Sequence, residues 1–283
     1  MKHFDRIEKM RHTCVAFGRF DGVHAGHQAV LRVLAEESKR RGNQSVVVSF
    51  YEDSGQEALT TEREKAYLME KYDIDILISL CAGRSWQEGS VQRMLIHELG
   101  AELLVTEKGA EPGFLKSEKF PVKTVETVSD GGEKITAEKI KKIFEKKDIK
   151  RVIKWCAHPF IIMNEVIHGK ALGRTVGMPT ANMKIDSRKY MPPCGVYATR
   201  TYVGGETFFG VTNVGTRPSV DNRPEITVET MLDDFDRDIY GEEIITEFHL
   251  FLREIRKFDG IEEVWRQVQK DRMRMREYFG IRG

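Results

Sequence analysis

Residues 13–42, TCVAFGRFDGVHAGHQAVLRVLAEESKRRG, hold the pattern that decides the fold of the first half of the chain. The apolar run at 13–18 predicts a strand, and the pattern at 27–42 predicts a helix that ends at Gly42. The alternation continues along the chain, with strands expected at 44–50, 75–80 and 101–106 and helices at 62–72 and 91–100. Strands separated by helices of this length indicate βαβ units and a parallel sheet with both faces covered. We therefore predict an α/β domain.

The composition narrows the class of protein. A chain of 283 residues favours two domains, and 40% hydrophobic residues is enough for packed cores. The 45 Lys and Arg almost balance the 44 Asp and Glu, which argues against nucleic acid as a partner. No apolar run approaches the roughly 18 residues that span a bilayer, and residues 1–12 lack the apolar stretch of a signal peptide. The four cysteines contain no CxxC pair, which argues against a zinc ribbon or a disulfide scaffold. We expect a cytoplasmic protein without membrane association.

The second half of the chain has a different pattern. A basic helical stretch at 139–154 is interpreted as a solvated face near the domain junction. Short strands are then expected at 161–169, 195–205, 206–215, 225–232 and 243–252, which together indicate a small antiparallel barrel. A final helix is expected after Asp259, with an apolar stripe formed by Ile261, Val264, Trp265, Val268, Met273 and Tyr278.

The first candidate site is Gly18-Arg-Phe-Asp-Gly-Val-His-Ala-Gly-His27, between the first strand and the first helix. Parallel sheets place ligands at the carboxyl ends of their strands, and a helix start favours a phosphate there. Gly22 and Gly26 let the backbone approach a ligand, and His24 and His27 are spaced to converge on one anion. As cations or as hydrogen-bond donors, they would stabilise charge on a phosphorus under attack. This pattern favours a nucleotide site over two surface histidines.

The second candidate site lies in residues 168–182, HGKALGRTVGMPTAN. Its glycines and cations suit a loop that wraps polyphosphate: Gly169, Lys170, Gly173 and Arg174. Pro179 favours an extended segment that presents the Thr180 hydroxyl and the Asn182 amide oxygen together. Two neutral oxygens suit Mg²⁺, which takes further ligands from water and phosphates. The simpler interpretation of Pro-Thr-Ala-Asn is a turn held by a side-chain-to-backbone bond.

Glu229 is the third candidate, in the strand pattern of residues 226–232. Alternation places it on one face with Thr227 and Met231, as the only carboxylate of that row. It is a candidate general base for an attacking hydroxyl. The residues alone favour a solvated glutamate at a strand edge over this role.

The first motif resembles the HxGH signature of the nucleotidyltransferase superfamily, nearest to the adenylyltransferase module of the bacterial bifunctional riboflavin kinase/FAD synthetase family. This resemblance implies a Rossmann-like fold, ATP at His24 and His27, and transfer of AMP to FMN with release of pyrophosphate. It implies nucleotide contacts at Gly18, Phe20, Asp21, Gly22 and Gly26. Three segments depart from the family pattern: 50–54 (FYEDS), 106–110 (TEKGA) and 135–141 (ITAEKIK). In the last of these, Lys141 stands where the family has the arginine that grips the triphosphate.

The second half resembles the riboflavin kinase module of the same family in order and spacing. The matching segments are HGKALGRTVGMPTAN, GVYATRTYVGG, GVTNVGTRPSV, ITVETMLDDFDRDIYGEEI and FLREIRKFDGIEEV. The resemblance implies a six-stranded antiparallel β-barrel with a C-terminal helix, and Mg-ATP held by Thr180 and Asn182. Glu229 would deprotonate the ribityl 5′-hydroxyl of riboflavin, and the loop with Gly169, Lys170, Gly173 and Arg174 would close over the phosphates.

We therefore predict a Rossmann-like α/β nucleotidyltransferase domain at 1–157 and a riboflavin kinase-like barrel at 158–283. The expected substrates are riboflavin, FMN and ATP, with Mg²⁺ as cofactor. Two alternatives remain open at this point. One is a riboflavin kinase whose first domain does not catalyse a reaction. The other is a non-catalytic, flavin-responsive regulator that uses residues 139–154 to reach RNA.

Overall fold

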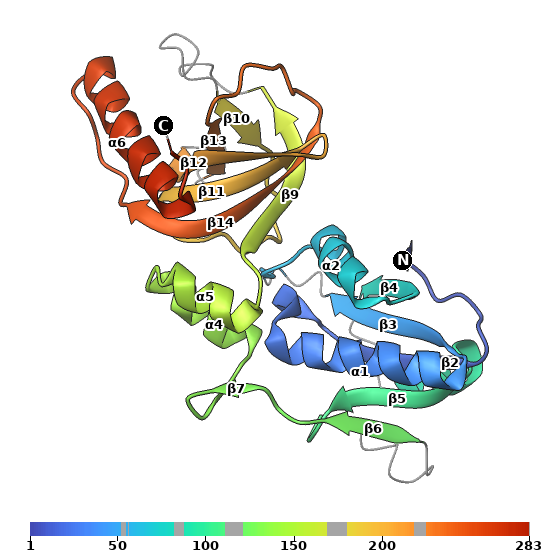
Figure 1. Cartoon of the computed structure of the whole chain (residues 1–283). Helices are drawn as coiled ribbons and strands as arrows, with labels where there is room; N and C mark the ends of the chain where they lie inside the picture. The colour runs from blue at the N-terminus through green and yellow to red at the C-terminus, as the bar shows by residue number, and fades with distance from the viewer. Residues whose placement is uncertain are drawn as a thin grey trace. The chain divides into compact units, whose positions relative to one another are not determined.

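The computed structural model describes residues 1–51, 55, 57–81, 88–110, 121–168, 180–217 and 225–282. Its internal packing divides the chain into two compact units, Met1–Lys139 and Ile140–Gly283 (Figure 1). Helix α4 (Ala137–Glu145) spans this division, and helix α5 (Ile149–Cys156) packs on strands of the second unit. The packing boundary therefore precedes the functional boundary expected at 157/158, because α5 buries Val152 and Trp155 with the second unit.

The first unit contains a six-stranded sheet in the order β1-β4-β3-β2-β5-β6, and all its described strand pairs are parallel. The strands are β1 (Lys2–Phe4), β2 (Thr13–Gly18), β3 (Gln44–Tyr51), β4 (Ile76–Cys81), β5 (Ala101–Glu107) and β6 (Val122–Val125). Its helices are α1 (Ala25–Arg41), α2 (Glu62–Met69) and α3 (Glu88–Arg93), and a short hairpin joins β7 (Ser129–Asp130) to β8 (Glu133–Lys134). This architecture confirms the predicted α/β domain.

Local sequence explains these elements. The centre of β3 is a run of valines that is wholly buried, as a strand covered on both faces requires. Helix α1 ends where predicted: Gly42 has a φ of 70° and donates its N–H to the carbonyls of Ser38 and Lys39. Helix α2 begins at a capping box formed by Thr61 and Glu64. Figure 1 shows α1 lying across the sheet, where it contacts β2, β3 and β5.

The second unit is a closed antiparallel barrel in the order β10-β13-β12-β11-β14-β9. Its strands are β9 (Phe160–Ile167), β10 (Thr180–Met183), β11 (Gly195–Val203), β12 (Glu206–Arg217), β13 (Glu225–Leu232) and β14 (Glu243–Arg253). The predicted six-stranded barrel is confirmed. Buried threonines line part of the interior, where the Thr212 hydroxyl lies 2.8 Å from those of both Thr199 and Thr230.

Helix α6 (Ile261–Phe279) packs on the outside of the barrel, against β11, β12 and β14 (Figure 1). The predicted apolar stripe is wrong, because Trp265 and Met273 are 46% and 62% exposed. The face turned to the barrel instead carries Asp271 and Met275, both 0% exposed. Asp271 is buried because the guanidinium of Arg253 lies 2.9 Å from its carboxylate. The N-cap is Gly260, not the predicted Asp259.

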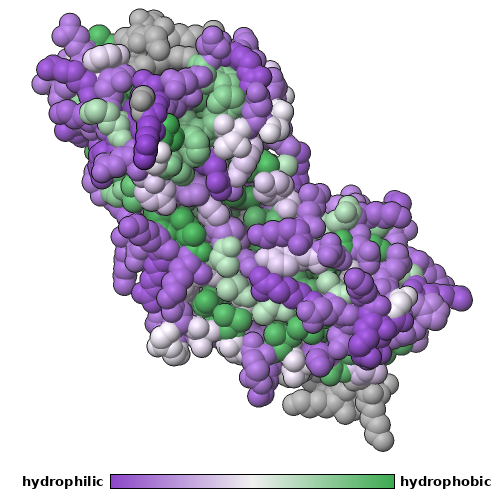
Figure 2. Space-filling view, in the orientation of Figure 1, coloured by the Kyte–Doolittle hydropathy of each residue, from purple (hydrophilic) through white to green (hydrophobic). Residues whose placement is uncertain are grey.

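The surface is mostly polar on the face drawn in Figure 2, with smaller hydrophobic areas between the hydrophilic ones. In the part of the chain that the structure describes, no helix is both long enough and apolar enough to cross a membrane. All four cysteines carry free thiols, two of them buried.

Candidate functional site

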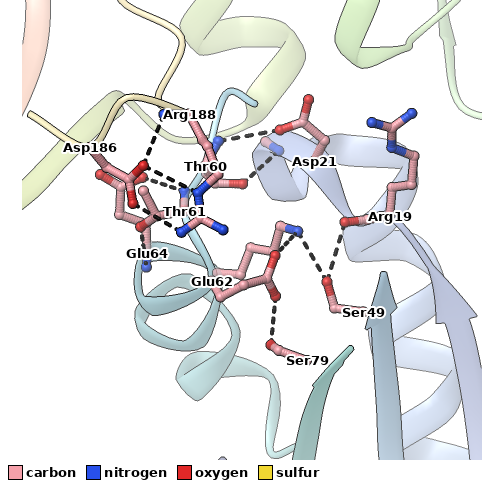
Figure 3. Close-up of polar contacts among 12 residues, drawn as sticks. Arg19, Asp21, Ser49, Thr60, Thr61, Glu62, Glu64, Ser79, Asp186 and Arg188 are labelled. Atoms are coloured by element: carbon pink, nitrogen blue, oxygen red, sulfur yellow. Dashed lines mark hydrogen bonds and ion pairs between the residues drawn. The ribbon is translucent and has the colours of Figure 1, made fainter. Parts of the chain in front are cut away.

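The loop between β2 and α1 is held in an uncommon backbone conformation. Phe20, Gly22 and Val23 have φ values of 48°, 76° and 39°, in the left-handed region that side chains rarely adopt. Such strain persists only where neighbouring structure maintains it. Here the Gly22 N–H donates to the Thr60 hydroxyl (2.9 Å), and the Thr60 N–H donates to the Asp21 carboxylate (3.2 Å; Figure 3). The loop before α2 thus fixes the motif.

The two histidines of the motif lie together, as the sequence predicts. His24 is the N-cap residue of α1, and its ring stacks on that of His27 with centroids 3.7 Å apart. The Phe20 ring lies 5.1 Å from His27. A Cβ on Gly26 would come within 3.2 Å of His24 Cε1, so the glycine provides the space into which the His24 ring folds. The HxGH spacing therefore builds an imidazole pair at the start of a helix.

The electrostatics of His27 favour a neutral ring. Burial lowers its pKa well below 6.5, and the charges of His24, Lys65 and Lys134 lower it further. Its Nδ1 atom is buried and has no hydrogen-bond partner among the described residues. Buried polar atoms are nearly always satisfied, so this nitrogen indicates a place for a ligand or water. Of the two forms considered from the sequence, His27 is therefore the neutral hydrogen-bonding one rather than the cation.

Lys141 belongs to the second unit by packing. Its Nζ lies 5.5 Å from the ring centroid of Tyr190, and the Tyr190 hydroxyl donates to the Lys141 carbonyl (3.3 Å). Its proposed contact with a triphosphate stays a prediction. Gly169, Lys170, Gly173 and Arg174 lie outside the described residues.

The second site is a row of polar side chains across three barrel strands. In the antiparallel register, Glu229 of β13 lies opposite Asn182 of β10 and opposite Asn213 of β12. Directly paired residues project from the same face of a sheet. That face is the outer one, because Met231, two residues beyond Glu229, packs in the cluster that contains Met275 of α6. The structure thus brings the predicted base beside the predicted metal ligand.

Asn182 is 6% exposed and is oriented by its own strand. Its amide nitrogen donates to the Thr180 carbonyl (3.4 Å), which leaves the amide oxygen as an acceptor. The Glu229 side chain is half-buried and has no hydrogen bond or ion pair with the described residues. No described side chain therefore competes with a substrate for this carboxylate.

Asn213 is a candidate that the sequence reasoning missed. Its segment, GVTNVG, contains no signal that sets the asparagine apart from a turn residue, since only the pairing of β12 with β13 brings it to Glu229. Two residues along β12, a Cβ on Gly215 would lie 3.5 Å from Thr227 Oγ1 and 3.6 Å from both Asn213 Nδ2 and Ile255 Cδ1. The glycine therefore leaves a small open cradle beside the polar row.

Comparisons with known proteins cover both units. A riboflavin kinase family model matches residues 156–279, and an FAD synthetase family model matches residues 6–143. The bifunctional riboflavin kinase/FMN adenylyltransferase of Escherichia coli (strain K12) is 30% identical over 95% of this chain and 93% of its own. The chain belongs to this family.

Other bifunctional riboflavin kinase/FMN adenylyltransferases agree with this assignment. The Bacillus subtilis protein is 28% identical over 96% of this chain and 94% of its own. A solved structure, titled the crystal structure of macrolide-efflux protein from Streptococcus pneumoniae, has a TM-score of 0.83 with 23% identity. It covers 97% of this chain and 98% of that one, and shows the fold alone.

Family membership confirms the predicted class of enzyme. The protein acts in flavin-nucleotide biosynthesis, with a riboflavin kinase module in the second unit and an FMN adenylyltransferase module in the first. The match at 6–143 includes the three segments that depart from the family's usual motifs.

Proposed function

We propose that the second unit transfers the γ-phosphoryl group of ATP to riboflavin with Glu229 as the general base. The observation that carries this proposal is the position of Glu229 on the outer barrel face, where it is paired in register with Asn182 on one side and Asn213 on the other. Glu229 takes the proton of the ribityl 5′-hydroxyl as its oxygen attacks the γ-phosphorus, and ADP leaves. Proton transfer of this kind contributes about 10²- to 10⁴-fold to the rate.

Thr180 and Asn182 suit the binding of Mg-ATP next to this base. Their side chains provide neutral oxygens, and the Asn182 amide nitrogen donates to the Thr180 carbonyl, which leaves the amide oxygen as the acceptor. Mg²⁺ accepts such ligands together with phosphates and waters. When bound, the ion supplies charge neutralisation for the transferring phosphoryl group.

In the first unit, we infer that the His24–His27 pair binds the phosphates of ATP while the FMN phosphate attacks the α-phosphorus. The α–β bond of ATP breaks, FAD forms, and pyrophosphate leaves. The start of α1 favours an anion here, and the buried Nδ1 of His27 has a hydrogen bond to give or accept. Positioning and electrostatics suffice for such a transfer, so no side chain need act as a nucleophile.

One observation supports a second candidate function, in which the protein is a riboflavin kinase whose first unit does not catalyse a reaction. Segments 50–54, 106–110 and 135–141 lack the family's usual residues, which is what a first unit that binds a nucleotide without turnover would also show. Incubation of the protein with FMN, ATP and Mg²⁺ distinguishes the two. We expect the wild type to form FAD and pyrophosphate in equal amounts, and His24→Ala to form neither. If the wild type forms no FAD, the first unit binds a nucleotide without turnover.

We infer that the enzyme works in the cytoplasm with soluble substrates. Four free thiols, two of them exposed, fit a reducing compartment.

The riboflavin kinase proposal itself is tested by FMN formation from riboflavin and ATP at increasing Mg²⁺. We expect FMN to rise with Mg²⁺ and to stop with a chelator. An enzyme that forms FMN equally well with the chelator present would contradict the metal assignment.

A further inference from the structure

A buried cation lies at the carboxyl end of the parallel sheet, outside the HxGH motif. The Lys65 side chain, from α2, is 2% exposed. Its Nζ donates to the Ser49 hydroxyl (3.0 Å) and to the Glu62 carboxylate (2.5 Å). The second oxygen of Glu62 accepts from the Ser79 hydroxyl at 2.5 Å (Figure 3). Two strands and one helix thus combine to hold one ammonium group.

The strand ends provide the hydroxyls around this group. Gly18, Ser49 and Ser79 are paired in register across β2, β3 and β4, close to the carboxyl end of each strand. The Ser49 hydroxyl bonds Lys65 directly, and the Ser79 hydroxyl bonds its partner Glu62. This edge of a parallel sheet is the one at which α/β folds bind their ligands.

Lys65 is connected to the HxGH motif in two ways. The Ser49 hydroxyl, which accepts from Lys65, donates to the carbonyl of Arg19 in the motif (3.4 Å; Figure 3). The Lys65 charge also acts on His27, whose pKa it helps to lower. Lys65 is therefore close enough to influence an anion that binds at the histidine pair.

Structural stability alone does not account for such a pair. The Lys65 side chain is 2% exposed, whereas that of Glu62 is 18% exposed. Removing an ammonium group from water is costly, and an apolar side chain of similar volume commonly stabilises a fold as well or better. A cation fixed close to a phosphate site, in contrast, strengthens binding without reorganisation when the ligand arrives.

We propose that Lys65 is a positioning residue of the nucleotide site in the first unit, which holds the loop of the HxGH motif through Ser49 and adds a positive charge close to it. Glu62 sets the strength of that charge by partly neutralising it. This inference rests on the proposed adenylyl transfer. It predicts opposite effects for the two members of one ion pair, which a purely structural pair does not.

The test compares Lys65→Met with Glu62→Gln in the full chain, using FAD formation from FMN and ATP. Lys65→Met is expected to raise the KM for ATP at least tenfold. Glu62→Gln is expected to lower that KM, even if thermal stability falls, because the ammonium is no longer neutralised. Thermal unfolding of the full chain, followed by circular dichroism, reports whether the first unit of each variant is folded.

The matched control is the ion pair of Glu37 and Arg40 in α1, which has the same three-residue spacing and a partly buried glutamate, but whose cation is 64% exposed. Arg40→Met is expected to leave the KM for ATP unchanged. An unchanged KM in Lys65→Met, or a rise of the same size in Glu62→Gln, would overturn the inference. A rise in Arg40→Met equal to that in Lys65→Met would overturn it as well.

Failure of the proposed function is seen separately, as no FAD from the wild type. The inference is then tested by measuring the Kd of the full chain for inorganic pyrophosphate. Only the binding that is lost in His24→Ala counts, because that binding is at the histidine pair. Lys65→Met is expected to weaken this binding at least tenfold, and Glu62→Gln to strengthen it. Unchanged binding in Lys65→Met, or no such binding by the wild type, contradicts the inference.

Discussion

Replacing Glu229 with glutamine removes the proposed base while keeping the size of the side chain. The side chain is half-buried and has no ion pair among the described residues, so we expect stability to change by no more than about 0.5 kcal/mol. Glutamine also keeps a polar side chain next to Asn182 and Asn213 in the strand register. Loss of a general base should lower kcat for FMN formation by about 10²- to 10⁴-fold, or about 3–5 kcal/mol in the activation free energy.

The assay is the initial rate of FMN formation at saturating ATP and Mg²⁺, with the Kd for ATP measured by titration. The variant should bind ATP as the wild type does. Glu243→Gln is the matched control, because Glu243 is an exposed carboxylate on β14, a strand that does not neighbour β13. It should keep the wild-type rate. A Glu229→Gln enzyme with more than a tenth of the wild-type kcat would refute the assignment.

Four further predictions follow from particular contacts. Between pH 7 and 5 the first unit should lose stability, since the unfolded His27 imidazole titrates near 6.5 and binds a proton that the folded ring does not. Denaturant unfolding should show a slope of up to about 1.4 kcal/mol per pH unit from this group, absent in His27→Gln; an equal slope in the variant contradicts the cause. Asn182→Ala should raise the Mg²⁺ concentration for half-maximal FMN formation at least tenfold, and an unchanged titration would exclude Asn182 as a ligand. Gly215→Ala adds a methyl group in ordinary van der Waals contact with Thr227, Asn213 and Ile255, so its denaturant midpoint should correspond to a change within about 0.5 kcal/mol; a larger loss would contradict this fit. Asp271→Ala should cost about 3–5 kcal/mol by leaving Arg253 unpaired, whereas Met273→Lys should stay within about 0.5 kcal/mol, as denaturant midpoints would show.

The α/β unit could be predicted well because its signals are local. The strand at 13–18 and the helix end at Gly42 follow from apolar runs and from one glycine that adopts a positive φ. Strand β10 lacked such a signal, since it has only four residues, Thr180–Met183, and was expected only as an extended segment. Its pairing with β9 and β13 depends on residues far along the chain.

Helix α6 shows where periodicity misleads. Its apolar residues suggested a buried stripe, but the face that lies against the barrel is the one on which Asp271 pairs with Arg253 from β14. A charged residue becomes a core residue only when a partner from another element meets it, which a helical pattern does not reveal.

The residues of the candidate sites also differ in whether local sequence could predict them. His24 and His27 were found because the motif itself brings them together within a single helical turn. The position of Asn213 beside Glu229, and of Lys65 close to the HxGH motif, depends on strand register and on the placement of α2. Such tertiary relations have no counterpart in residue spacing.

The central claim is that one chain makes FMN in its second unit and converts it to FAD in its first. The most direct measurement is a single incubation of the wild type with riboflavin, ATP and Mg²⁺, with riboflavin, FMN and FAD separated and quantified over time. We predict that FMN accumulates first and that FAD follows after a lag. FMN without FAD would contradict the assignment to the first unit, and the absence of FMN would contradict the account as a whole.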